Sequence, residues 1–245
     1  MRTLAERRQV NKWIARGASD YAIAGITGIP RGTIQWWRTH PRSGPQSRGK
    51  PWRPPDPAAY AYLLGLYLGD GCLGTRGCQL MVALDARYPG IVQAAEDAIA
   101  ATVPNITTRR YRPKDNVIRV LASSTTWRDG FPQHGPGRKH LRAISLAPWQ
   151  RKITQGYPRE LLRGLIHSDG CRTINCFKTK LPSGRVAAYE YPRYFFSNLS
   201  EDIRRIFCEH CELLGIRWTQ SNPRNISISH RRSVALMDEF IGPKS

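Results

Sequence analysis

The sequence is poor in acidic residues. It has 18 Asp and Glu against 38 Lys and Arg in 245 residues, which leaves a formal net charge of +20 at pH 7. A field of that sign favours a polyanionic partner, and nucleic acid is the usual one. A ribosomal type of basic protein or a protein of the membrane surface has a similar charge balance, so the charge alone leaves these alternatives open.

Two further features are absent. No apolar stretch approaches the roughly 20 residues that a transmembrane helix needs, and the N-terminus lacks the pattern of a signal peptide. We therefore expect no membrane partner, a cytoplasmic and nucleoid-associated protein, and six cysteines that remain reduced thiols. The sequence does contain 40% hydrophobic and 9% aromatic residues, which excludes a disordered chain.

The first 40 residues predict a small helical domain. Helices are expected over 4–17, 20–27 and 31–40, and a glycine-containing turn separates the last two. This is the order of elements in a helix-turn-helix DNA-binding domain, although any three-helix module shares it. The net charge of +8 over residues 1–57 favours DNA. The third helix would direct Ile34 and one of its two tryptophans inward and would offer to the major groove Arg31, Thr33, Gln35 and Arg38.

Residues 41–57 predict an extended linker. The segment holds six prolines together with Gly, Ser and Arg, which is not the composition of a packed core. Two roles fit it equally well, a tether between domains or a segment that lies along DNA phosphates. In the second role Arg53 is a candidate DNA contact.

Beyond this linker the sequence carries an internal repeat. YLLGLYLGDG at 62–71 and LLRGLIHSDG at 161–170 share their Leu, Gly and Asp-Gly positions, and Asp169 lies 99 positions after Asp70. Each copy is typical of an apolar helix that ends on a carboxylate, where the helix dipole disfavours negative charge. Two such copies indicate two similar halves of one domain.

The residues after each copy show the same coarse pattern. In the first half a helix is expected at 89–102, among strand-like segments at 78–84, 105–111 and 116–122, and a short helix follows the last of them. In the second half helices are expected at 200–215 and 231–240, among strand-like segments at 173–178, 189–197, 216–221 and 225–230. Each half is predicted to run α-β-β-α-β-β-α. The fold class is therefore α+β, a pseudo-twofold pair of half-domains at 58–156 and 157–245, preceded by the small all-α domain at 1–40.

The two repeated segments resemble the signature helices of the LAGLIDADG homing endonucleases. The resemblance is specific at the two nine-residue motifs, 63–71 and 162–170, and at their spacing. It implies two half-domains whose sheets form a concave DNA-binding saddle, in a monomeric, site-specific DNA endonuclease that makes metal-dependent double-strand breaks by phosphodiester hydrolysis. The N-terminal helices are an addition to that two-motif enzyme. Residues of an intein-type splice junction are not apparent, so a free-standing protein is expected.

The residues of the repeats agree with that activity. Gly65 and Gly164 lack a Cβ and would let the two helices pack closely, so that Asp70 and Asp169 meet at the centre. The two carboxylates repel each other, and divalent cations such as Mg²⁺, which prefer oxygen ligands, would relieve the repulsion. Metals held there can activate water and stabilise the leaving oxygen of a phosphodiester. The alternative is that each aspartate only ends a helix before a glycine, which leaves the repeat unexplained.

The resemblance adds further candidates around this metal site. It places Gly69 and Ser168, which precede the two aspartates, next to the metal. It also implies basic side chains that stabilise charge on the scissile phosphate. Lys152 and Lys244 end the two halves at corresponding places and are the candidates for that catalytic role.

The resemblance further implies that alternate side chains of the strands read bases in the major groove of double-stranded DNA. A slip of one residue in strand register would turn every such side chain to the other face, where it would be ordinary solvated charge. With the register open, the candidates are Arg76, Gln79, Arg110, Arg112 and Arg119 in the first half and Arg172, Asn175, Lys178, Arg193, Arg217 and Gln220 in the second.

Two pairs of residues depart from the family pattern or lie outside it. Leu68 and His167 stand where the family motif has an acid, although not the acid that binds metal, and a packing role for His167 is favoured over a proton relay. Cys208 and Cys211 have the CxxC spacing of zinc ligands. Their place on an amphipathic helix favours buried thiols instead, so zinc is not expected.

Two other functions remain open. A transcription regulator on the same scaffold would bind DNA without nuclease activity, and an RNA maturase on this fold would also suit the basic charge. Both motif aspartates are present, and a protein that only binds DNA does not need both. The sequence therefore favours the nuclease.

Overall fold

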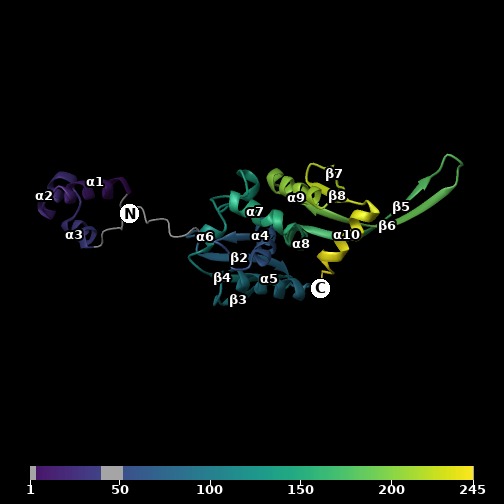
Figure 1. The fold of residues 1–245 in the computed structure, drawn as a ribbon, viewed down its shortest axis with the longest axis horizontal. Coiled ribbons are helices and arrows are strands. Elements are labelled where there is room, and N and C mark those ends of the chain that lie inside the picture. The colour runs from purple at the N-terminus through teal and green to yellow at the C-terminus, as the bar shows by residue number, and fades with distance from the viewer. Residues whose placement is uncertain (1–3, 40–51, 245) are drawn as a thin grey trace. The chain divides into compact units, whose positions relative to one another are not determined.

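The structure, a computed structural model, describes residues 4–39 and 52–244 of the chain (Figure 1). The chain divides into two compact units, Met1–Pro51 and Trp52–Ser245, and each has a hydrophobic core of its own. Within the described residues, no helix has both the length and the apolar character needed to cross a bilayer.

The first unit contains, in chain order, α1 (Leu4–Ala15), α2 (Asp20–Thr27) and α3 (Arg31–Thr39). The Ser19 hydroxyl accepts a 3.2 Å hydrogen bond from the backbone N–H of Ala22 and so begins α2, while Gly28, with a φ of 66°, ends it. The side chains buried between the helices are those of Val10, Ile23, Ile29, Ile34 and Trp37. Trp37 is therefore the tryptophan that packs inward, and Trp36 is exposed.

The second unit repeats one arrangement of elements twice. The first half contains α4 (Pro57–Asp70), β1 (Gly71–Leu73), β2 (Gln79–Asp85), α5 (Pro89–Thr102), β3 (Thr108–Lys114), β4 (Val117–Ser123) and α6 (Trp127–Gly130). The second half contains α8 (Pro158–Asp169), β5 (Gly170–Lys180), β6 (Val186–Ser197), α9 (Glu201–Leu213), β7 (Thr219–Asn222), β8 (Asn225–Ile228) and α10 (Arg231–Ile241). Between the halves lie η1 (Lys139–Leu141) and α7 (Pro148–Gly156).

Each half holds one antiparallel sheet. The strand orders are β1-β2-β4-β3 and β5-β6-β8-β7, so the two sheets have the same topology. The predicted α+β fold with two α-β-β-α-β-β-α halves is confirmed. The sequence pattern does not locate β1, because three residues are too few to show an alternation, nor does it single out α7.

Helices α4 and α8 lie side by side at the centre of the second unit (Figure 1). α4 is buried from Tyr60 to Leu68, as expected of a helix that also contacts α5, α7 and the first sheet. A Cβ on Gly65 would lie 2.5 Å from the carbonyl oxygen of Leu161 and 2.8 Å from Cα of Gly164. The glycines therefore bring the two backbones into direct contact.

The chain joins the core of the second unit before α4 begins. Trp52 packs edge-on against Tyr60 and Trp149, with ring centroids 5.8 Å apart in both pairs. The end of the segment 41–57, expected to be a linker, is thus anchored to the second unit. Residues 41–51 of that segment lie outside the described residues.

Each sheet has one face covered by helices and one open face. Leu80 and Val82 of β2, and Tyr194 and Phe196 of β6, are buried on the covered side. Their neighbours along each strand point to the opposite side, because side chains alternate across a strand. We call this opposite side the open face, and the strand register assigns each residue to one face or the other. The β5–β6 hairpin extends beyond the helices that cover its sheet (Figure 1).

Candidate active site and nucleic-acid interface

The two aspartates of the repeated motifs are the last residues of α4 and α8. A Cβ on Gly69 would lie 3.0 Å from Oδ2 of Asp169, so the ends of the two helices are in contact. The pKa of Asp70 is raised to about 6, first by loss of hydration and then by the nearby charge of Asp169. The fold thus brings together two carboxylates whose charges are in conflict.

Lys139 lies beside this pair. Its Nζ lies within hydrogen-bond distance of four carbonyl oxygens, those of Tyr67, Leu68 and Gly69 at 2.6, 2.7 and 2.6 Å and that of Gly71 at 2.9 Å, and its three N–H groups are shared among them. Burial lowers the pKa of Lys139 to about 8, and the two aspartates oppose that shift. A cation at this place satisfies carbonyl groups that the end of a helix leaves without partners, and it offsets the negative end of the helix dipole.

Lys244 takes the corresponding place at the end of α8. Its Nζ donates to the carbonyl oxygen of Gly170 at 2.5 Å and to that of His167 at 3.2 Å. Burial lowers the pKa of Lys244, while Asp70 and Asp169 are among the groups that oppose this shift. Each motif helix therefore ends on a carboxylate and is capped by a lysine from elsewhere in the chain.

The structure does not place Lys152 in this arrangement. Lys152 is exposed on α7 and lines a separate hollow with Trp149 and Tyr157. The counterpart of Lys244 in the first half is Lys139, which corrects the choice made from the sequence. Lys139 lies in the connection after α6, which the repeat does not include, so no sequence pattern pointed to it.

The surroundings of the two aspartates differ. Oδ2 of Asp169 accepts a 2.5 Å hydrogen bond from the side-chain amide of Asn198. Among the described residues, no group donates a hydrogen bond to the carboxylate of Asp70. The Ser168 hydroxyl donates to two carbonyl oxygens of its own helix, each at 3.0 Å, and Gly69 has no side chain. The side-chain oxygens left for a metal are therefore those of the two aspartates.

This donor set fits Mg²⁺ when DNA is present. Mg²⁺ in proteins commonly binds through one or two carboxylates and completes its shell with substrate phosphates and water. Within residues 4–39 and 52–244, no group of three or more His, Cys, Asp and Glu side chains is arranged to hold a metal ion. A cation between Asp70 and Asp169 would thus need a phosphate to complete its coordination.

His167 is part of the helix interface. Its Nδ1 lies 2.9 Å from the Tyr62 hydroxyl, and its Nε2 lies 3.0 Å from the carbonyl oxygen of Ile241. The carbonyl can only accept, so Nε2 carries the proton and Nδ1 accepts from Tyr62. Burial lowers the pKa of His167 to about 4 and keeps the ring neutral. His167 thereby ties α4 and α8 to the end of α10, three residues before Lys244.

The CxxC cysteines are buried in α9. Burial raises the pKa of Cys208 to about 12 and that of Cys211 well above its usual value. A zinc ligand has to be a thiolate, and these surroundings favour the thiol.

In the first sheet, Gln79 and Arg119 lie on the open face, as the register of β2 and β4 shows. Arg110 points to the covered face, where its guanidinium forms a 2.5 Å ion pair with Glu96 of α5. Arg110 therefore stabilises the sheet–helix contact and does not face a ligand of the open side. The register adds two open-face residues that the sequence analysis did not name, Arg109 and Tyr111.

In the second sheet, Asn175 and Arg193 lie on the open face. Arg172 and Lys178 take the opposite parity and point to the covered side, where Nε of Arg172 lies 2.7 Å from Oδ1 of Asp238 in α10. All four side chains are polar and lie on the same hairpin, so only the strand register determines which of them face the open side.

Aromatic side chains also occupy the open face of the β5–β6 hairpin. Phe177 and Tyr189 are paired across the strands and stack with ring centroids 5.3 Å apart, and Tyr191 meets Phe177 edge-on at 6.0 Å. The open face of this sheet is thus more apolar than a pattern of basic residues suggests.

The remaining strand candidates lie at the margins of the sheets. Arg76 is in the turn between β1 and β2, and Arg217 is exposed just before β7. Arg112 donates to a main-chain carbonyl of the β3–β4 turn at 2.6 Å. Gln220 pairs with a buried residue of β8 and so belongs to the covered face. The guanidinium of Arg53 lies 5.2 Å from an indole ring of the second unit.

In the first unit, Arg31 and Gln35 are exposed on α3, and Thr33 is half-buried. Arg38 has a structural contact instead. Its Nε lies 2.8 Å from Oδ1 of Asp20, and its Nη2 donates to a backbone carbonyl before α2 at 2.7 Å. Arg38 therefore joins α3 to α2, and the exposed surface of α3 includes Arg31 and Gln35 together with Trp36.

The sequence matches no protein-family model and no curated protein. The fold is similar to that of solved LAGLIDADG structures. Full-length DUF199/WhiA from Thermatoga maritima gives a TM-score of 0.49 at 14% identity over 76% of this chain and 55% of that one, so this chain spans about half of its length. I-DmoI in complex with DNA and Mn gives 0.49 at 13% identity over 76% and 98% of the two chains. The LAGLIDADG meganuclease I-AabMI bound to uncleaved DNA gives 0.47 at 10% over 74% and 82%.

Proposed function

We propose that this protein is a site-specific DNA endonuclease that makes double-strand breaks with the help of divalent cations, Mg²⁺ in particular. The observation that supports this best is the meeting of Asp70 and Asp169 at the adjoining ends of α4 and α8. The two carboxylates repel each other and lie at the negative ends of two helix dipoles, so they cost stability in the free protein. A cation site accounts for both residues, whereas a purely structural role accounts for neither.

Divalent cations at this pair would activate water and stabilise the leaving oxygen of a phosphodiester. Asp70 and Asp169 would hold them, each toward the strand nearest its own half. Lys139 and Lys244 cap the two helices beside the aspartates and add positive charge where negative charge develops on the phosphate. Two equivalent halves in one chain suit cleavage of both strands by a monomer.

The DNA would lie along the open faces of the two sheets. Gln79 and Arg119 in one sheet, and Asn175 and Arg193 in the other, can then reach base edges in the major groove. The exposed surface of α3 would add contacts outside the central site. The net charge of +20 supplies a general attraction to phosphates under this proposal.

The test is cleavage of a duplex carrying the genomic sequence that flanks the gene, with Mg²⁺ present. We expect Asp70→Asn and Asp169→Asn each to abolish double-strand cleavage while DNA binding persists. Asp97→Asn, on the exposed side of α5, is the matched control and should cut like the wild type. Undiminished cleavage by both active-site variants would overturn the proposal.

A second function is a DNA-binding transcription regulator without nuclease activity. The observation in its favour is the hydrogen bond from Asn198 to Asp169, because this amide occupies a lone pair that a metal would use. Tight DNA binding by the wild type without cleavage in Mg²⁺ or Mn²⁺ would select this function. Gain of cleavage in Asn198→Ala would then identify the amide as the cause.

A further inference from the structure

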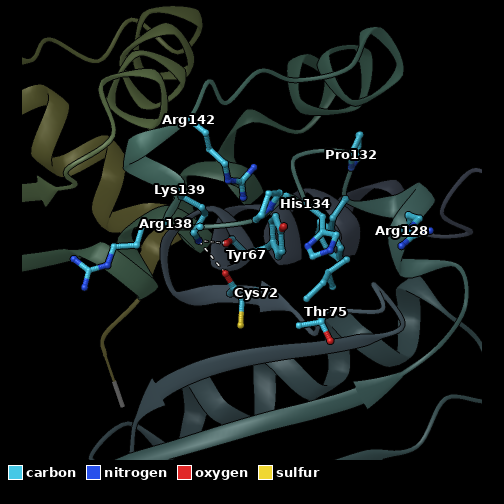
Figure 2. A pocket seen from close by; sticks show the side chains of 15 residues that line it. Tyr67, Cys72, Thr75, Arg128, Pro132, His134, Arg138, Lys139 and Arg142 are labelled. Carbon is cyan, nitrogen blue, oxygen red and sulfur yellow. Dashed lines mark hydrogen bonds between the residues drawn. The ribbon is translucent and has the colours of Figure 1, made fainter. Parts of the chain in front are cut away.

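A cavity of about 970 Å³ opens in the first half (Figure 2). One wall is β1 with the turn that follows it, and the other is the segment 131–142, which includes η1. Lys139 lines this cavity and also lies within electrostatic reach of Asp70 and Asp169, so the cavity adjoins the candidate active site. Pockets of roughly 300–1,000 Å³ hold small organic ligands, so the space is larger than a bare phosphate requires.

The lining of this cavity is cationic. Figure 2 shows Arg142, Lys139 and His134 gathered around Tyr67, with Arg128 at one edge. Among the described residues, no Asp or Glu side chain lines it. The pKa of His134 is lowered, first by burial and then by the two arginines, so its imidazole is neutral at pH 7. Such a lining attracts an anion.

The same cavity has an apolar side. Leu73, Phe131 and Pro132 are among the residues that line it, together with His134. A neutral imidazole can stack on a planar ring, as histidines do on nucleic-acid bases. A planar group joined to an anion therefore matches the lining better than an anion alone.

The segment that forms the cavity is longer than the capping lysine requires. In the second half the chain runs from Ile241, the end of α10, directly to Lys244. In the first half residues 131–138 separate the end of α6 from Lys139. Arg142 holds this longer path in shape by donating to the backbone carbonyl of Gln133. The extra residues thus build a wall that the other half lacks.

We propose that this cavity is a nucleotide-binding site that takes one nucleoside phosphate. The phosphate lies beside Arg142 and Lys139, and the base lies against Leu73, Pro132 and the imidazole of His134. The assignment of a nucleotide to this cavity rests on the proposed function in one respect, the source of the ligand. Under that function a DNA strand bound at Asp70 and Asp169 would pass the cavity.

The ligand has two possible sources, which share this chemistry. One is a nucleotide turned out of a DNA strand, whose phosphate is a diester. The other is a free mononucleotide, whose phosphate is a monoester with greater charge. Both present a base and a phosphate to the same lining, and competition with small ligands separates them.

The experiment uses the full chain without DNA or metal and follows the fluorescence anisotropy of 1,N⁶-ethenoadenosine 5′-monophosphate. We expect dAMP to compete at least tenfold better than deoxyadenosine or inorganic phosphate. Thr75→Trp fills the cavity from the β1–β2 turn and should weaken binding at least tenfold, whereas Thr125→Trp, in an exposed turn outside it, should not. The exposed Arg128→Ser should weaken binding severalfold, and Arg151→Ser on α7 is its control.

Three results would overturn the assignment. The first is competition by inorganic phosphate as strong as that by dAMP. The second is absence of binding by the folded wild type. The third is binding by Thr75→Trp and Arg128→Ser that is as tight as binding by the wild type. Competition by the dinucleoside monophosphate d(ApA) supports a strand as the source, and competition by dAMP alone supports a free nucleotide. Because no cleavage is measured, loss of the nuclease proposal in the Asp70→Asn test leaves this result intact.

Discussion

At the scale of single residues, the carboxyl group of Asp70 links folding to pH and, under the proposed function, to metal binding. Its pKa is raised from 3.8 to about 6 in the folded chain, so the folded state favours the protonated form. The resulting stabilisation is complete below pH 4 and is lost as the pH rises through 6. At neutral pH the ionised group therefore destabilises the protein, and under the proposed function a bound cation would offset this cost.

We predict that Asp70→Asn raises the free energy of unfolding at pH 7.5. The expected gain is on the order of 1 kcal/mol, because the side chain reaches solvent and screening reduces the effect. Thermal unfolding of both proteins measures this gain, and the same measurement with bound DNA, with and without Mg²⁺, measures the response to the metal. The wild type should gain stability from Mg²⁺ when DNA is bound and lose this gain below pH 6, whereas the variant should gain none. Equal responses of the two proteins would contradict the metal site.

The stability contribution of His167 depends on pH in the opposite direction to that of Asp70. Its pKa is lowered from 6.5 to about 4, so its contribution to stability is complete above pH 6.5 and is lost as the pH falls through 4. A shift of this size in a buried group corresponds to about 3 kcal/mol at most. As the pH falls over the same range, protonation of Asp70 adds to the stability of the folded protein. The contributions of Asp70 and His167 therefore partly cancel in the wild type.

We predict that His167→Phe lowers the free energy of unfolding at pH 7.5 by about 1–3 kcal/mol, since it leaves the Tyr62 hydroxyl and the Ile241 carbonyl without partners. The acid-induced loss between pH 6.5 and 4 should disappear with it. Chemical denaturation of the variants in the Asp70→Asn background isolates the contribution of His167 to the free energy of unfolding. Tyr62→Phe, which removes only one of the two hydrogen bonds, should show a smaller change.

At the scale of elements, the contact between α4 and α8 decides where the aspartates meet. A Cβ on Gly65 would approach backbone atoms of the facing helix, which cannot rotate away as a side chain can. We predict that Gly65→Ala costs at least about 2 kcal/mol of stability, because two helices have to separate. Gly156→Ala, at the end of α7 where a Cβ would meet nothing within 4 Å, is the control. Because Ala favours a helix more than Gly does, Gly156→Ala should be neutral or slightly stabilising, and an equal stability loss in both variants would contradict close packing as the cause.

Strand register makes a second prediction at this scale. Arg119 lies on the open face, whereas Arg110 is paired with Glu96 on the covered face. We expect Arg119→Ala to weaken DNA binding by about 1–3 kcal/mol at fixed salt, if it contacts a base. Arg110→Ala should leave the affinity within twofold of the wild type. Titration of a labelled duplex at two salt concentrations compares them, and equal losses would show that net charge and not the face decides binding.

At the scale of the whole molecule, the described residues form two hydrophobic cores, which share no buried residue. One consists of Val10, Ile23, Ile29, Ile34 and Trp37, and the other extends through both halves of the second unit. A core that continues across α4 and α8 makes the two halves unfold together, whereas the three-helix unit has a small core of its own.

We predict two transitions in thermal unfolding. Ile34→Ala should lower the midpoint of the first alone and Leu165→Ala that of the second alone, each by removing about 2–4 kcal/mol of core packing. Calorimetry separates the transitions, and the variant that shifts each one assigns it to its unit. A single transition shifted by both variants would show that the units unfold as one.

The sequence by itself determined the repeated halves, the presence and order of most helices and strands with bounds within about three residues, and the positions of the two motif aspartates. These depend on hydrophobic period, on capping residues and on the spacing of two copies, all of which are local. The tertiary structure alone decided that Lys139 and not Lys152 matches Lys244, because hydrogen bonds to a helix end are made by whichever lysine the folded chain brings there. It also decided which arginines face outward. Neighbouring positions of one strand point to opposite sides, and only the buried neighbours and ion pairs of each side chain show which side is which.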